Sequence, residues 1–155
     1  MRSSVLKPRL AAVGAIFRER HGAEVAAQVA GRAAEYAAVR DAVGLTDFSF
    51  LHKFRVPAGR GLDFLDGLLA GNVPKIRFGR ILHTFLADSD GLLLGDCYVA
   101  NNDEELVFLC EGIAPDGELP ALLQAAGAAE AGVEDLTGTH AQAAEVAVHR
   151  RAGAG

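Results

Sequence analysis

The chain has 155 residues and a formal net charge of −5; half of its residues are hydrophobic, and its 15 basic residues are scattered along it. This length predicts one domain with a hydrophobic core. No stretch approaches the roughly 20 uninterrupted apolar residues of a membrane span, and the basic residues form no nucleic-acid footprint. Met1–Leu10 lacks a signal-peptide pattern, and Cys97 and Cys110 lack metal-ligand spacing, so we expect a cytoplasmic protein with reduced thiols in its core.

Two helices are expected before residue 44. Leu10–Arg20 places its apolar residues on roughly one helical face, and Ala23–Val43 is rich in alanine, the residue with the highest helix propensity. Gly44 follows where a glycine commonly ends a helix, and Gly31 can divide the second helix in two. Residues 1–34 are therefore expected to form an N-terminal helical segment.

The spacing of apolar residues then changes to a period of two. Leu45–Pro57 alternates and predicts a half-buried strand, and Gly59–Leu69 returns to helical spacing. Gly79–Glu111 contains strand-like apolar runs separated by turn residues at Asp88–Gly91 and at Asn101–Glu104. This part of the chain is typical of an antiparallel meander.

The C-terminal part adds shorter elements. A helix is expected from Pro115 through about Gln124, a last strand at Val133–Leu136, and helical spacing over His140–His149, before a frayed tail at Arg150–Gly155. The predicted fold class is therefore α+β, an antiparallel sheet with helices packed on it.

One acidic residue interrupts an otherwise apolar strand. Gly95-Asp96 separates Leu92–Leu94 from Cys97–Val99, which places a carboxylate in a segment that looks buried. An ionised carboxylate buried alone is costly, so Asp96 must be hydrogen-bonded, paired or used in chemistry. The structural alternative is that Asp96 accepts backbone N–H bonds at a bulge made by Gly95.

Four segments in order resemble the aminomethyltransferases of the glycine cleavage system, the T-proteins. They are Glu35–Ser49, Phe64–Val73, Gly79–His83 and Asp90–Asp96. The resemblance covers about residues 35–148, which would be only the N-terminal part of that family's tetrahydrofolate-binding fold, and leaves 149–155 as a tail. Within the family, the Gly-Asp pair followed by a strand and an acidic turn is more similar to the folate-dependent O-demethylase branch.

The resemblance implies a site that binds tetrahydrofolate and transfers a one-carbon unit to its N5. It implies a catalytic and cofactor-binding role for Asp96, which takes the position of the family's conserved acid. His83, Tyr98 and Glu111 are the further cofactor-binding candidates. His83 stands where the family has tyrosine, and Gly95 where it has a second acid. Each candidate has a structural alternative: a satisfied strand histidine, a packing tyrosine, and a glutamate that faces open water.

The resemblance therefore predicts a tetrahydrofolate-binding domain or subunit of an aminomethyl or methyl transferase. Its partners would be folate, a small one-carbon donor and a protein that supplies the family's remaining domains. Two alternatives stay open. One is a non-catalytic folate-binding or assembly module, or the small subunit of a heteromeric enzyme similar to sarcosine oxidase; the other is a degenerate fragment or interaction domain without a ligand.

Overall fold

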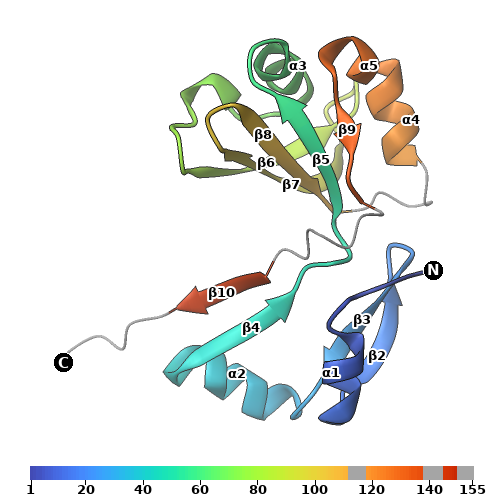
Figure 1. Ribbon diagram of the computed structural model, residues 1–155, viewed down its shortest axis with the longest axis vertical. Coiled ribbons are helices and arrows are strands. Elements are labelled where there is room, and N and C mark those ends of the chain that lie inside the picture. Colours follow the sequence, from blue (N-terminus) through green and yellow to red (C-terminus); the bar gives the residue numbers. More distant parts are fainter. Residues whose placement is uncertain (112–117, 138–144, 150–155) are drawn as a thin grey trace, which may run out of the picture. The chain divides into compact units, whose positions relative to one another are not determined.

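The computed structural model describes residues 1–111, 118–137 and 145–149. The chain divides into two compact units, Met1–Phe50 with His140–Gly155 and Leu51–Thr139. Antiparallel pairing and packed helices make the fold α+β, which confirms the predicted class (Figure 1).

The first unit holds two small sheets. One has the strand order β1-β3-β2, and in the other β4 pairs antiparallel with β10. Its elements are β1 (Arg2–Ser3), α1 (Lys7–Ala12), β2 (Ile16–Arg20), β3 (Ala23–Gln28), α2 (Arg32–Asp41), β4 (Val43–Asp47) and β10 (Glu145–His149).

The two helices expected before residue 44 are wrong over much of their length. The first ends at Ala12, and Ile16–Arg20 instead forms β2, which pairs antiparallel with β3. His21 and Gly22 have positive φ values of 49° and 70°, so the chain turns tightly between the two strands. The buried positions alternate along β3, and this pairing overrides the helix propensity of its alanines. Only the part after Gly31 is helical, as α2.

Two further expectations change at β4. The strand expected over Leu45–Pro57 is two strands, because Asp47 Oδ1 accepts the Ser49 N–H at 2.9 Å and turns the chain between β4 and β5. The helical spacing of His140–His149 also misleads: Glu145–His149 is a strand paired with β4, where cross-strand bonding decides the conformation. Residues 140–144 and the tail 150–155 lie outside the described residues.

The second unit is a five-stranded antiparallel sheet of order β6-β7-β8-β5-β9 with helices beside it. It confirms the meander, the helix after Gly59, the described part of the helix that ends near Gln124, and the short last strand. Its elements are β5 (His52–Pro57), α3 (Arg60–Leu68), the short 3₁₀ turn η1 (Val73–Lys75), β6 (Ile81–Ala87), β7 (Leu93–Asn101), β8 (Glu105–Cys110), α4 (Glu118–Ala125), α5 (Ala128–Ala131) and β9 (Glu134–Asp135).

One face of this sheet carries the core. Helices α3, α4 and α5 lie along that face (Figure 1), and their leucines and alanine pack against alternate residues of β5–β8. On the opposite face, β6 presents Ile81, His83 and Phe85 to solvent, with 68% and 41% of Ile81 and Phe85 exposed. Among the described residues, no helix is long and apolar enough to cross a membrane.

Candidate functional site

The exposed face of the second unit brings Asp96 and His83 into contact. Asp96 Oδ1 lies 2.7 Å from His83 Nε2, a hydrogen bond that the imidazole donates when Nε2 carries the proton. The two residues are diagonal neighbours, since His83 pairs with Tyr98 and Phe85 pairs with Asp96. Their side chains are 49% and 41% exposed, so this is a surface pair rather than a buried one.

Aromatic rings surround the imidazole. The His83 and Tyr98 rings stack with centroids 4.9 Å apart, and Phe85 meets His83 edge-on at 5.2 Å. Phe85 was not among the candidates named from the sequence, although its position two residues after His83 places it on the same face of the strand. The result is an aromatic surface beside the carboxylate.

The ladder between β6 and β7 contains a bulge next to Gly95, while Asp96 lies in its regular part. Leu86 pairs with Gly95 but Ala87 pairs with Leu93, so Leu94 is an extra residue in β7. The expected bulge is therefore present, but the Asp96 carboxylate bonds to His83 and not to backbone N–H groups at the bulge. The expectation that this segment is buried is right only for Cys97 and Val99, which face the core.

Glu111 lies next to the pair at the end of β8. Its backbone N–H donates to the Asp96 carbonyl at 2.9 Å, and its side chain is half-buried. The second carboxylate oxygen of Asp96 has no hydrogen-bond partner among the described residues. All four candidates from the sequence thus lie in one neighbourhood, and Asp96 keeps a free acceptor there.

These groups can bind a flat ring that carries N–H donors. Aromatic surfaces bind rings by stacking, and a carboxylate oxygen next to them accepts a ring N–H. His83 holds the Asp96 carboxylate in one orientation, which lowers the conformational cost of binding. Among the described residues, no three His, Cys, Asp or Glu side chains gather as a metal site.

Two buried thiols lie directly behind the site. Cys97 and Cys110 are fully buried, as expected for core cysteines, and their sulfur atoms are 3.2 Å apart. The Glu111 N–H bond to the Asp96 carbonyl places the two cysteines at a non-hydrogen-bonded pair of the ladder, where side chains are closest. The hydrogen bond to Cys110 and burial raise the pKa of the Cys97 thiol.

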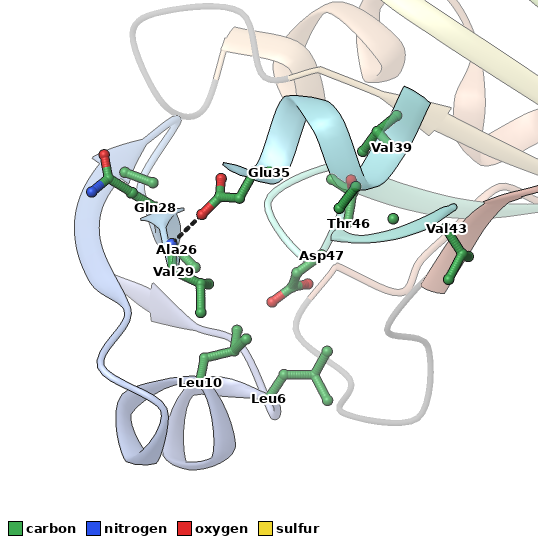
Figure 2. A pocket seen from close by; sticks show the side chains of 13 residues that line it. Leu6, Leu10, Ala26, Gln28, Val29, Glu35, Val39, Val43, Thr46 and Asp47 are labelled. Carbon is green, nitrogen blue, oxygen red and sulfur yellow. Dashed lines mark hydrogen bonds between the residues drawn. The ribbon is translucent and has the colours of Figure 1, made fainter. Parts of the chain in front are cut away.

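The first unit contains a separate cavity of about 400 Å³ (Figure 2). Leu6, Leu10 and Val29 supply apolar walls. Glu35 also lines it, and its carboxylate accepts the backbone N–H groups of Val29 and Ala30 at 2.5 and 2.7 Å. These bonds lower the pKa of Glu35. None of the four site candidates lines this cavity.

Comparison with known proteins decides the family. Residues 6–146 match the model of the GCVT N-terminal domain. The chain belongs to this family. The resemblance to T-proteins seen in the sequence is thereby confirmed for their N-terminal part, while the likeness to the O-demethylase branch stays a prediction.

Curated aminomethyltransferases from two organisms illustrate the sequence similarity of this chain to known proteins. The protein of Saccharopolyspora erythraea is 31% identical over 131 residues, which are 84% of this chain and 36% of the relative. The protein of Parafrankia sp. is 32% identical over 150 residues, 96% of this chain and 40% of the relative. The chain therefore spans little more than a third of these relatives.

A solved structure supports the same fold. The crystal structure of the glycine cleavage system aminomethyltransferase T from Bartonella henselae superposes with a TM-score of 0.71 at 18% identity, over 88% of this chain and 38% of that chain. Because the match covers 88% of this chain, it includes residues of both compact units.

Proposed function

We propose that this chain is a tetrahydrofolate-binding domain of a one-carbon transferase, with its binding surface at Asp96, His83 and Tyr98. The observation that carries the proposal is the 2.7 Å hydrogen bond between His83 and Asp96 beside the stacked Tyr98 ring, in a GCVT-family chain. Similar proteins are named aminomethyltransferases, and the donor of the carbon unit here would be an aminomethyl or methyl compound.

The residues fit tetrahydrofolate by their chemistry. Its pterin is a flat ring with N–H donors, and the exposed surface offers aromatic side chains and an unpartnered carboxylate oxygen. Bound tetrahydrofolate supplies the nucleophilic N5 that takes the carbon unit. Asp96 would accept a hydrogen bond or a proton from the reacting N–H, and His83 would keep the carboxylate aimed at it. Glu111 would contact the same ligand from the end of β8.

We propose that a protein partner also takes part in the transfer of the carbon unit. The chain spans about a third of its curated relatives, and the second unit exposes large apolar side chains that a partner could cover. These include Phe78, Ile81, Leu92 and Leu93, each at least 65% exposed. We propose that a second protein segment with the remaining family domains docks on part of this surface.

The substitution Asp96→Asn tests the assignment. It keeps the shape of the side chain but removes the charge that strengthens a hydrogen bond from a ring N–H. We therefore expect the affinity for 5-formyltetrahydrofolate to fall by a factor of about ten or more. Stability should change by less than about 1 kcal/mol, because the pair with His83 is nearly half exposed. Calorimetric titration measures the affinity, and thermal unfolding measures the stability.

Asp90→Asn is the matched control. Asp90 lies in the exposed turn between β6 and β7, and its side chain makes no hydrogen bond or ion pair with a described residue, so removal of its charge should leave binding unchanged. Equal effects of the two substitutions, or a loss of folding in Asp96→Asn, would make Asp96 a structural residue. A folded wild-type chain that binds no folate, alone or with the protein encoded beside it, would favour the interaction-domain alternative.

A further inference from the structure

The two cysteines of the chain face each other directly behind the candidate site. They are the only cysteines in the sequence, both are completely buried, and Cys97 pairs with Cys110 across β7 and β8. Their sulfur atoms are 3.2 Å apart. No third metal-ligating side chain gathers with them among the described residues, so the pair is left with the chemistry of two neighbouring thiols.

Each cysteine is the sequence neighbour of a residue of the candidate site. Asp96 and Tyr98 flank Cys97 in β7. Glu111 follows Cys110 at the end of β8, and its N–H donates to the Asp96 carbonyl at 2.9 Å. Because side chains alternate along a strand, the thiols point into the core while Asp96 and Tyr98 point to the exposed face. A movement of the two strands at the cysteines therefore moves the site.

A disulfide between these cysteines would push the strands apart. The Cα atoms of a non-hydrogen-bonded antiparallel pair are about 4.5 Å apart, whereas Cα atoms joined by a disulfide are mostly about 5.5–6 Å apart. Bond formation therefore separates β7 from β8 by about 1 Å at Cys97 and Cys110. The separation stretches the adjacent bond from the Glu111 N–H to the Asp96 carbonyl and displaces the Asp96 carboxylate. Strained disulfides are also the readily reduced, regulatory ones.

The position of the pair allows a reagent to reach it without global unfolding. Cys110 is the last residue of β8, and its pair with Cys97 is the last one of the ladder between the two strands. Local opening at the end of a strand costs less free energy than unfolding of the whole unit. A small disulfide can then react in two steps. One cysteine thiolate attacks it and releases a thiol, and the second cysteine attacks the mixed disulfide and releases another. The two cysteines are oxidised, and the reagent is reduced to two thiols.

We propose that Cys97 and Cys110 form a reversible redox switch, in which their disulfide displaces Asp96 and weakens the binding of tetrahydrofolate. The effect on binding rests on the proposed function, whereas the formation of the disulfide does not. Loss of one well-placed hydrogen bond lowers an affinity by about tenfold, so the disulfide form should bind 5-formyltetrahydrofolate about tenfold more weakly than the dithiol form. By thermodynamic linkage, bound folate must favour the dithiol form by the same factor.

Redox titration of the full chain with reduced and oxidised glutathione measures this linkage. The intrachain disulfide is detected by mass as the loss of two hydrogens, and calorimetric titration compares the folate affinity of the two forms. At a ligand concentration that saturates both forms, the value of [GSSG]/[GSH]² at half oxidation should rise about tenfold, which raises the reduction potential by about 30 mV. Reduction with dithiothreitol should restore the original affinity.

Cys97→Ala and Cys110→Ala are the matched controls, because each leaves a single thiol. Each variant should bind the folate with the same affinity before and after the oxidising treatment, and the wild-type titration tests the switch even where a variant does not fold. Equal affinity of the dithiol and disulfide forms, or tighter binding by the disulfide form, would refute the switch while the proposed function stands. A chain that carries glutathione but no intrachain disulfide would refute it as well. Binding of folate by neither form would refute the proposed function and the switch with it.

Discussion

Replacing Gly61 by alanine should destabilise the second unit. Gly61 lies in the first turn of α3, and a Cβ at this position would come 2.4 Å from Cγ1 of Val56 in β5. Val56 is completely buried and its branched side chain is stiff, so it must push into the core to make room. Overpacking costs about 1–3 kcal/mol and helix propensity returns about 0.5–1 kcal/mol, so the net loss lies between about 0 and 2.5 kcal/mol, with a central value of roughly 1 kcal/mol.

Gly67 in the same helix is the matched control. A Cβ at Gly67 would meet no atom within 4 Å, so only the gain in helix propensity remains. Gly67→Ala should therefore stabilise the second unit by about 0.5–1 kcal/mol. Both substitutions add one methyl group to α3, but only the one at Gly61 meets a side chain of β5.

Urea unfolding followed by tyrosine fluorescence measures both effects. The chain has two tyrosines and no tryptophan, and Tyr36 lies in the first unit with 65% of its surface exposed. In a Tyr36→Phe background, the remaining Tyr98 reports on the second unit alone, and the unfolding midpoint multiplied by the slope m gives the free energy of unfolding. If Gly61→Ala is as stable as Gly67→Ala, α3 does not pack on β5 at the distance described.

Two further predictions concern the thiols and the first unit. Treatment with diamide, which is reduced to its hydrazine, should form a disulfide between Cys97 and Cys110 within one chain, with a mass loss of two hydrogens. Because the pKa of Cys97 is raised, the rate of disulfide formation should be slow at neutral pH and rise with pH. A disulfide between two chains would refute the pairing. Glu35→Gln should lower the melting temperature at pH 7, because the ionised carboxylate accepts two backbone N–H groups. Because the pKa of Glu35 is lowered in the folded chain, the stability that its ionised carboxylate contributes is fully present above the ordinary pKa of a glutamate and is lost as the pH falls through the folded-state pKa. The difference in melting temperature between the wild type and Glu35→Gln should therefore vanish in strong acid. A difference that persists there would refute this explanation.

Local signals in the sequence predicted the second unit well. Helical spacing after Gly59, turn residues at Asp88–Gly91 and Asn101–Glu104, and alternation between them each act over a few residues. The core lies within one continuous segment, so no distant strand had to be known. Three of the four segments that carry the family resemblance lie in this unit, and the fourth, Glu35–Ser49, lies in the first unit.

The first unit depended on pairings that propensity does not reveal. Alanine favours a helix by only a few tenths of a kcal/mol per residue, and strand pairing of β3 with β1 and β2 outweighs this. Strand β10 pairs with β4 from about 100 positions later in the chain, roughly the whole second unit apart, and helical spacing at Glu145–His149 carried no sign of it.

The candidate site shows the same division between local and distant information. Matching parity in β7 was enough to place Asp96 and Tyr98 on one face. Their contact with His83 depends on register, and the extra residue Leu94 shifts that register by one at the turn side of Gly95. If Leu94 paired with Leu86 instead of bulging out, Cys97 would lie opposite His83 in place of Tyr98. The single inserted residue thus decides which side chain of β6 meets the carboxylate, so the bulge beside Gly95 belongs to the site as much as the side chains do.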